Sequence, residues 1–229
     1  MKRFIHDEQP QEFYDSFNSF IISSDLKLFA KLYSKFKLVE LVKDIPGDIV
    51  KLGVFKGSGL FAWLKINALC NINSKKVYGF DVFDIDQVLS NLDGMQRDMM
   101  SNLFSQRSFN PNDTSIDYFS FLEATLEKSG FQNCHLIKGD VLETIPEFVK
   151  SNPGFRASIV NFDLHIDKPT FKCLESLWDR ITPGGIAIFD EYAVNQWDES
   201  NAVDRFLKNK DIKLISTGFQ APTAYLIKN

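Results

Sequence analysis

The sequence predicts an α/β domain with a mostly parallel, seven-stranded, Rossmann-like sheet and helices on both faces. Short apolar runs alternate with segments of helical length along most of the chain, which is the pattern of repeated strand–helix units. Glycine or acidic residues follow the first three of these runs, as they do where parallel strands end at a ligand. The chain has 229 residues and shows no linker or internal repeat, so we expect one domain over residues 1–229.

A helical N-terminal part precedes the first strand. In residues 1–44, apolar side chains recur at helical spacing, with Phe13 and Phe17 on one face and Leu28 and Leu32 on another. The pattern predicts two amphipathic helices that form an N-terminal extension of the domain. We expect them to wall a substrate pocket or to meet a second copy of the chain in a homo-oligomer, most simply a dimer.

The rest of the chain alternates between strands and helices. Apolar runs predict strands at 49–53, 76–81, 134–138, 158–162, 185–190, 212–217 and 223–228. The intervening segments predict helices near 57–70, 117–129, 142–151, 170–180 and 199–209. Pro183-Gly184-Gly185 predicts a turn that leads into the fifth strand.

Residues 84–116 do not fit this alternation. The stretch is rich in Asp, Asn, Ser, Gln and Met, and its periodicity is weak. Because it is too long for an ordinary connection inside a compact domain, we interpret it as an insertion, either a lid or a mobile segment.

Charge and composition exclude several classes of partner. Lys and Arg number 26 against 30 Asp and Glu, a net charge of −4, which argues against a surface for nucleic acid. The apolar fraction of 44% and the charged fraction of 24% are typical of a globular protein. No apolar run approaches the length of a transmembrane helix. We therefore expect a small-molecule partner, with no nucleic acid and no membrane.

The cysteines indicate a reducing compartment. Cys70, Cys134 and Cys173 are odd in number, far apart and without a C-x-x-C pair, so neither a disulfide framework nor a zinc site is supported. The first residues turn acidic where a signal peptide would be apolar. These features predict a cytoplasmic protein with free thiols.

A glycine-rich turn follows the first strand. Gly53, Gly57 and Gly59 precede an apolar helix, and glycines there let a ligand approach the backbone while the helix N-terminus presents its N–H groups. The spacing G-x-x-x-G-x-G does not satisfy the dinucleotide fingerprint G-x-G-x-x-G. A plain strand–turn–helix connection therefore remains an alternative.

Two acidic residues at later strand ends strengthen the ligand hypothesis. Asp81 ends the second strand, where a carboxylate can accept both hydroxyl groups of a ribose. Its alternative role is a helix cap or turn residue. Asp140 follows the third strand in the sequence Lys-Gly-Asp. Together with the glycines, these acids predict an adenosine-containing ligand at the carboxyl edge of the sheet.

Three more carboxylates follow the fourth and fifth strands. Asp163 comes after one apolar run, and Asp190 with Glu191 after the next. If these strands are neighbours, the three acids converge, and oxygen ligands without cysteine suit Mg²⁺. The alternative is that one or two of them are helix caps or loop charges.

Of the three histidines, only His165 is expected near this cluster, two residues after Asp163. It can serve as a general base, as a hydrogen-bond partner of the substrate or as an exposed loop residue. His135 lies inside an apolar run and is expected to be structural, and His6 lies near the chain end.

Several segments, taken together and in order, resemble the macrocin O-methyltransferase family. They are PGDIVKLGVFKG (46–57), GFDVFD (79–84), KGD (138–140), PGGIAIFDEY (183–192) and NAVDRF (201–206). The similarity spans about residues 45–210, which makes it more specific than any single motif.

The resemblance implies a class I methyltransferase fold that uses S-adenosylmethionine and, helped by Mg²⁺, methylates a hydroxyl of a sugar or glycosyl group, which a nucleotide can carry. Gly53 and Gly57 with the nearby backbone would hold the methionine part, Asp81 the ribose, and Asp140 with Val141 the adenine. The implied cofactor residues are Gly53, Val54, Phe55, Gly57, Ser58, Asp81, Asp140 and Val141. The implied metal ligands are Asp163, Asp190 and Glu191. From the residues themselves we expect Asp163 and His165 to be catalytic, with either His165 or one of the cluster carboxylates as the general base.

The sequence departs from the family pattern at two places. Lys51 stands where the family usually has an acid that can orient the ammonium group of the cofactor. The family's usual Asp-x-Asp-x-Tyr-x-Ser-Thr reads Asp163-Leu-His165-Ile-Asp167-Lys-Pro-Thr170 here, which indicates a different acceptor pocket. Two alternatives therefore stay open: methylation of a catechol-like or other small diol, and a methyltransferase-like binding module without catalysis.

Overall fold

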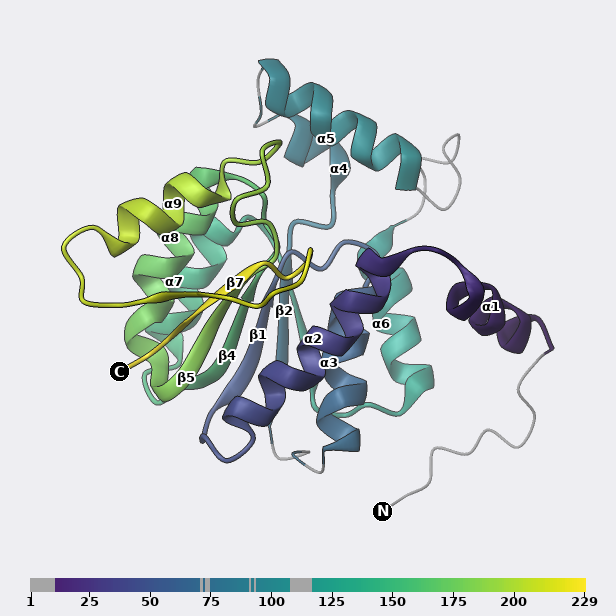
Figure 1. Cartoon of the computed structure of the whole chain (residues 1–229), viewed down its shortest axis with the longest axis horizontal. Helices are drawn as coiled ribbons and strands as arrows, with labels where there is room; N and C mark the ends of the chain where they lie inside the picture. Colours follow the sequence, from purple (N-terminus) through teal and green to yellow (C-terminus); the bar gives the residue numbers. More distant parts are fainter. Residues whose placement is uncertain (1–10, 71, 73–74, 91, 93, 108–116) are drawn as a thin grey trace.

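The computed structural model describes residues 11–70, 72, 75–90, 92, 94–107 and 117–229. Its centre is a seven-stranded sheet in the order β3-β2-β1-β4-β5-β7-β6 (Figure 1). The strands are β1 (Asp48–Leu52), β2 (Val77–Asp81), β3 (Cys134–Lys138), β4 (Ala157–Phe162), β5 (Ile181–Phe189), β6 (Leu214–Ser216) and β7 (Ala224–Ile227). The helices are α1 (Gln11–Ile22), α2 (Leu26–Val42), α3 (Ser58–Leu69), α4 (Ile85–Ser90), α5 (Gly94–Arg107), α6 (Tyr118–Ser129), α7 (Val141–Ser151), α8 (Asp167–Leu177) and α9 (Glu199–Leu207), with a 3₁₀ turn, η1, at Trp178–Arg180.

The sheet confirms the predicted class, with one antiparallel strand. The first five strands run parallel, whereas β7 pairs antiparallel with both β5 and β6. Residues 217–223 join β6 to β7, and so short a connection cannot hold the crossover that a parallel pair requires. The parallel carboxyl ends of β1 to β5 therefore share one edge.

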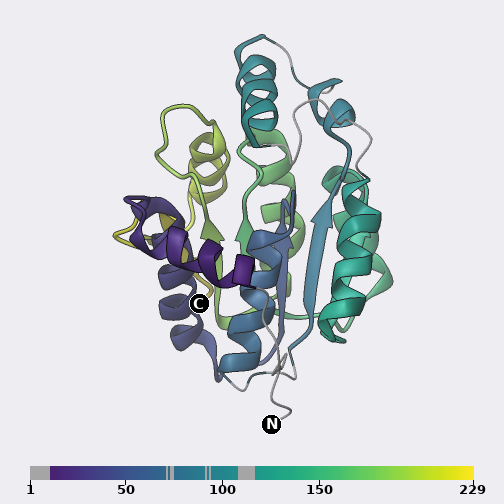
Figure 2. The same cartoon turned by 90° about the vertical axis from the view of Figure 1, so that its right-hand side faces the viewer.

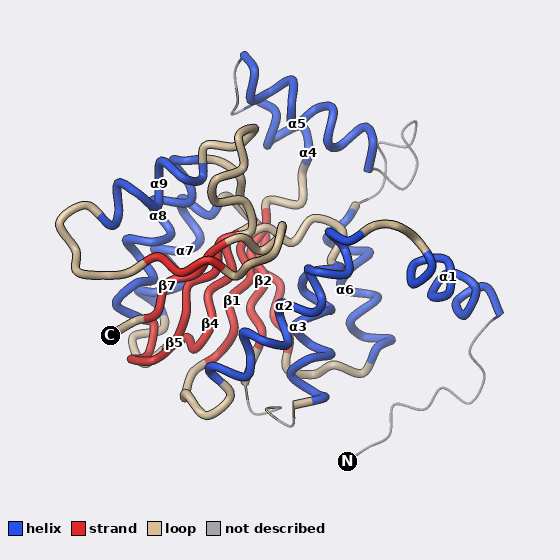
Figure 3. Tube along the Cα trace, viewed as in Figure 1, coloured by secondary structure: helices blue, strands red, loops and turns tan. Residues whose placement is uncertain are grey.

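Two layers of helices enclose the sheet (Figure 3). Alternation along β1 places Ile49 in a core cluster with α2, α3 and α6, and Val50 in a second cluster with α7, α8 and α9. Lys51 follows by the same alternation on the α2 side, yet it is buried, with 1% of its surface exposed. A buried lysine at a strand end requires an anionic partner.

Residues 84–116 contain more structure than their composition predicts. The described part forms α4 and α5, which lie beyond the strand ends (Figure 2). Their weak apolar periodicity is explained by their position, because a helix above a polar strand edge has little core to face. Residues 108–116 of the expected insertion lie outside the described residues.

One other expectation needs correction. Pro183-Gly184-Gly185 does not form a turn before the fifth strand. The three residues lie inside β5, where the pairing with β4 shifts register between Ala157 and Ile159. The glycines absorb this irregularity, with Gly184 at φ +85°. His135, which we expected to be structural, lies in the edge strand β3, where its exposed ring stacks on Tyr78 with 5.2 Å between the ring centroids.

Both N-terminal helices are present, but they differ in packing. Leu38 and Val42 of α2 are buried against the sheet layer, whereas none of the residues 11–22 of α1 is buried. Figure 1 shows α1 projecting away from the sheet. Within the described ranges, the helices are too short or too polar to cross a membrane.

Candidate functional site

A cavity of about 670 Å³ lies at the carboxyl edge of β1 to β4, beneath α4 and α5. This volume is in the range of small-molecule sites, about 300–1,000 Å³. Of the residues expected at the site, it is lined by Gly53, Val54, Phe55, Ser58, Asp81, Asp140, Val141, Asp163, His165 and Glu191. Gly57 and Asp190 lie outside this lining.

The glycine turn is shaped by close backbone contacts. Gly53 has φ +79°, and a Cβ atom there would lie 2.2 Å from the carbonyl oxygen of Asp163. Gly57 has φ +91°, and its Cβ would lie 2.4 Å from Cδ2 of Leu122. Both glycines are therefore required by the packing between β1, β4 and α6, which explains why Gly57 is needed without lining the cavity.

We expect Gly53→Ala to destabilise the protein by about 3 kcal/mol or more, because positive φ and a backbone clash act together. The matched control is Gly218→Ala, where φ is +77° but nothing lies within 4 Å of the added Cβ. This control isolates the backbone strain, about 1 kcal/mol. Urea unfolding of both variants measures the difference, and equal losses would contradict the close contact between residues 53 and 163.

Asp81 connects the end of β2 to the glycine turn. Its Oδ2 accepts hydrogen bonds from the backbone N–H groups of Val54, at 2.6 Å, and Phe55, at 2.8 Å. Its Oδ1 accepts from the N–H of Phe83 at 2.9 Å. The carboxylate therefore has the turn-holding role that the sequence left open, and it also faces the cavity. Oδ1 keeps one lone pair for a ligand hydroxyl, whereas both lone pairs of Oδ2 are used by the turn.

Asp140 caps the helix that follows β3. Its Oδ1 accepts a hydrogen bond from the N–H of Leu142 at 2.9 Å, and the adjoining Val141 begins α7. Both residues line the cavity, as does Phe83. A flat apolar group held between such walls, with acids at its polar ends, matches an adenosine, so the lining fits S-adenosylmethionine.

The predicted carboxylate cluster forms, and each of its acids is paired with a lysine. Oxygen–nitrogen distances are 2.7 Å for Asp163–Lys51, 3.1 Å for Asp190–Lys31 and 3.4 Å for Glu191–Lys27. The other oxygen of Asp190 accepts a hydrogen bond from Asn161 at 2.8 Å. Three carboxylates thus face three ammonium groups.

These pairs control the protonation of the cluster. Burial alone would raise the pKa of Asp163, but Lys51 and Lys31 outweigh it and hold that pKa far below its usual range. Burial also lowers the pKa of Lys31 on its own, yet Asp163 and Asp190 raise it overall. Burial raises the pKa of Glu191, against the opposing charge of Lys27. Asp163 and Lys31 are therefore fully charged at neutral pH.

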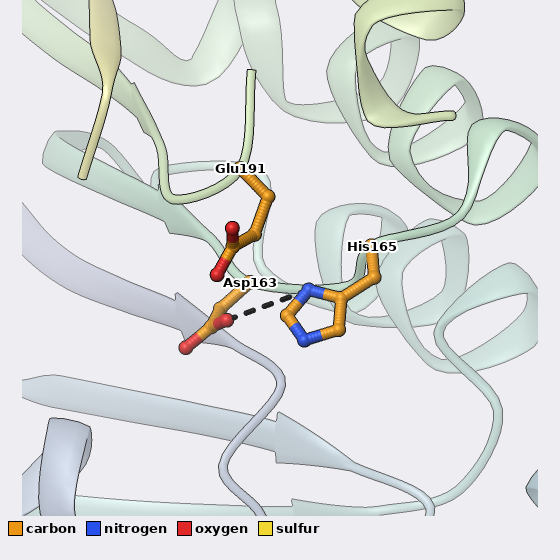
Figure 4. Close-up of side chains that lie close together, drawn as sticks. All are labelled: Asp163, His165 and Glu191. Carbon is orange, nitrogen blue, oxygen red and sulfur yellow. Dashed lines mark ion pairs between the residues drawn. The ribbon is translucent and has the colours of Figure 1, made fainter. Parts of the chain in front are cut away.

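His165 is placed against Asp163 and an aromatic wall. Figure 4 shows His165 and Glu191 extending toward Asp163, with 3.7 Å between His165 Nδ1 and Asp163 Oδ1. The imidazole packs on Trp197 with 4.5 Å between ring centroids, and its backbone has φ +67°. Burial lowers the pKa of His165, so the neutral ring is available to accept a proton.

Sequence reasoning missed the three lysines of α2. Lys27, Lys31 and Lys35 recur every fourth residue, so they share one helix face, where like charges repel one another. Three lysines on one helix face indicate that acidic side chains elsewhere in the fold pair with them. Lys35 is 3% exposed and donates to the carbonyl oxygen of Lys31 at 3.3 Å.

The residues fit a divalent cation only in part. One atom each of Asp163, His165 and Glu191 lies within 4.8 Å of the others, and His165 Nδ1 and Glu191 Oε2 are buried without a hydrogen-bond partner among the described residues. Mg²⁺, however, prefers an all-oxygen shell. The lysines also neutralise the negative charge of the cluster. An ammonium group 4 Å from a dication would repel it by about 8 kcal/mol, twice the repulsion between two unit charges. The charge balance therefore does not fit Mg²⁺.

Comparison with known proteins gives a consistent result. A family model described as macrocin-O-methyltransferase matches residues 31–217. A protein of Streptomyces olivaceus, 8-demethyl-8-(2,3-dimethoxy-alpha-L-rhamnosyl)-tetracenomycin-C 4'-O-methyltransferase, is 23% identical over 158 residues, 68% of this chain. This chain spans about half, 56%, of the length of that relative.

Solved structures show the same fold. The calicheamicin methyltransferase CalS11 superposes with a TM-score of 0.68 at 22% identity, covering 98% of this chain and 95% of that one. Its apo form, described as a TDP-rhamnose 3'-O-methyltransferase, gives a TM-score of 0.67 at 22% identity and covers 99% and 98% of the two chains. The O-methyltransferase NovP gives 0.65 at 18% identity and covers 87% and 79%.

Proposed function

This chain belongs to the macrocin O-methyltransferase family, and on that premise we propose that it transfers a methyl group from S-adenosylmethionine to a hydroxyl group of a sugar or glycosyl acceptor. The family match over residues 31–217 carries the proposal. Further support comes from the cavity, which is lined by every cofactor residue expected from the sequence except Gly57. Two of the proteins described above, the Streptomyces olivaceus enzyme and CalS11, are named for rhamnose acceptors, which favours a sugar acceptor over a small diol.

The cofactor lies, in this proposal, across the ends of β1, β2 and β3. Gly53 and Ser58 bound the methionine end, where the N-terminus of α3 begins. Asp81 accepts a ribose hydroxyl at Oδ1, which keeps the one lone pair that the turn leaves free. Asp140 and Val141 bound the adenine end. Lys51 does not repel the cofactor's ammonium group, because Asp163 neutralises it at 2.7 Å.

When bound, S-adenosylmethionine supplies a methyl group on a sulfonium, whose sulfur keeps the electron pair of the broken bond. An alcohol is a poor nucleophile near neutral pH, so a base must take its proton as the new oxygen–carbon bond forms. His165 is that base in this proposal, because its neutral ring lines the cavity. Asp163, 3.7 Å away, stabilises the imidazolium that results.

Methyl transfer to sugar nucleotides and to small diols, measured with labelled S-adenosylmethionine, tests the proposal. We expect turnover with a sugar nucleotide. Replacing His165 with alanine is expected to lower kcat about 10²–10⁴-fold, the usual contribution of a general base, and to leave cofactor binding intact. The matched control is His135→Ala, because His135 is exposed on β3, on the surface of the sheet edge. Turnover with diols alone, or full activity of His165→Ala, would contradict the proposal.

The described part of the chain also supports a homodimer through α1 and α2. Of the fifteen exposed large apolar side chains, twelve lie between Phe13 and Leu41. An isolated helix of twelve residues is marginal in water, so α1 needs another surface to pack against. A second copy supplies the same apolar face, and the two faces bury each other in a symmetric pair.

Sedimentation measures this association. We expect a dimer for the unmodified chain, and a dissociation constant raised at least about tenfold by Phe17→Asp, because the new charge loses its water at the interface. Asn18→Asp adds the same charge beside it and is expected to change little. A monomer at all concentrations would contradict the pairing.

The cytoplasmic location stays a prediction, consistent with the free thiols of Cys70, Cys134 and Cys173.

A further inference from the structure

The positive charge beside the three carboxylates comes from lysine side chains of this chain. Asp163, Asp190 and Glu191 each contact one lysine ammonium, from Lys51, Lys31 and Lys27 respectively. Two of these lysines come from α2 and one from β1, so two separate elements converge on the same acids. This inference rests on the proposed methyl transfer, because it assigns the charge that such a reaction needs.

Lys51 is held in a prepared place. It is 1% exposed, and its ammonium lies 2.7 Å from Asp163 Oδ2. Its side chain passes beside Gly59 on α3, where a Cβ atom would lie 2.9 Å from Cε of Lys51. The missing side chain at residue 59 therefore makes room for the lysine.

Lys31 reaches the same cluster from α2 and remains accessible. Its side chain is 25% exposed and lines the cavity together with Asp163 and His165. The Asp190 carboxylate that holds it is 1% exposed, and both of its oxygens are engaged, one by Lys31 and one by Asn161. Asp190 is thus a support for the lysine, with no oxygen turned into the cavity lining.

We propose that Lys51 occupies the place of a divalent cation at this sheet edge and that Lys31 presents positive charge to the acceptor, so that methyl transfer proceeds without a divalent metal. Lys31 is then a catalytic residue, because it touches the acceptor oxygen. Lys51 is a positioning residue, because it acts by fixing Asp163.

The charges balance without a metal ion. As the acceptor hydroxyl attacks, its proton passes to His165, and negative charge gathers on the oxygen until the new oxygen–carbon bond is complete. An ammonium group held beside that oxygen stabilises this charge. The electron pair of the broken sulfur–carbon bond stays on sulfur, so no other reactant is required.

A Mn²⁺ titration followed by electron paramagnetic resonance tests the inference directly, because it needs no turnover. The unmodified, chelator-treated chain is expected to leave added Mn²⁺ free in solution. Lys51→Glu restores an acid beside Asp163 and is expected to gain one site of micromolar affinity. Lys51→Met removes the same charge without adding a ligand and is expected to gain none. Circular dichroism checks that each variant is folded.

Lys31 is tested by kinetics in chelator. We expect the unmodified chain to keep its kcat in chelator, and Lys31→Met to lower kcat about 100-fold, as loss of one charged stabilising group does, with an unchanged dissociation constant for S-adenosylmethionine. Lys31→Arg is expected to recover part of the rate, because it retains the charge.

Three results would overturn the inference. They are micromolar Mn²⁺ binding by the unmodified chain, loss of its activity in chelator, and a folded Lys51→Glu variant that binds no Mn²⁺. If no acceptor is methylated, the proposed function fails, while the Mn²⁺ titration still decides whether Lys51 stands in the place of the cation.

Discussion

Asp163→Asn is expected to remove methyl transfer and to destabilise the fold at the same time. The change leaves Lys51 buried without its anion, and breaking a buried ion pair costs about 3–5 kcal/mol. Because the Asp163 side chain is 21% exposed, we expect the lower end of that range, about 3 kcal/mol, in the free energy of unfolding. The rate falls as well, since His165 loses the carboxylate that stabilises its protonated form.

Asp167→Asn is the matched control for this variant. Asp167 also pairs with a basic residue, Arg205, at 2.7 Å, but that pair is exposed, and exposed pairs contribute about 0–1 kcal/mol. Denaturant unfolding of both variants gives the comparison. Similar losses of stability would show that the Lys51–Asp163 pair is not buried as described. Full activity of Asp163→Asn would contradict its place beside the base.

Asp81→Asn is expected to abolish cofactor binding while leaving the sheet intact. Asparagine has one acceptor oxygen, so its NH2 group faces either the N–H groups of Val54 and Phe55 or the N–H of Phe83, and at least one backbone donor loses its acceptor. An unsatisfied buried donor costs about 1–3 kcal/mol, and the ribose loses its carboxylate in addition. We therefore expect the dissociation constant of S-adenosylmethionine to rise about 100-fold or more.

Asp140→Asn provides the comparison for Asp81→Asn. Asparagine caps a helix as well as aspartate does, so α7 keeps its N-terminus and the backbone of Val141 stays in place. Calorimetry should then show a much smaller loss of cofactor affinity than for Asp81→Asn. Equal losses would mean that the adenine end, and not the glycine turn, dominates binding.

Much of the fold follows from local sequence pattern. The strands before Gly53, Asp81, Asp140 and Asp163 are short apolar runs ended by a residue that the next turn requires, and the structure places all four ends at one edge. The antiparallel direction of β7 could not be predicted, because an apolar run does not encode strand direction. Helix α5 escaped it because no continuous core face marks its sequence.

The electrostatics of the site were harder to predict. Three acids at two strand ends indicated a cation, but two of the three cations that the structure supplies come from α2, more than 100 residues away in sequence from Asp163. The spacing of the lysines on α2 indicates that they share one helix face, but it does not indicate which residues that face contacts. Lys51 was recognised as a departure from the family, yet its pairing with Asp163 depends on the β1–β4 register, which sequence pattern alone does not fix.

Calorimetric titration of S-adenosylmethionine into the chelator-treated, cofactor-free chain tests the central claim most directly. We expect one site per chain with micromolar affinity, no requirement for a divalent metal, and loss of binding in Asp81→Asn. Absence of any binding heat from folded protein, at more than one temperature, would contradict an active methyltransferase and favour a binding module that has kept the fold without the cofactor.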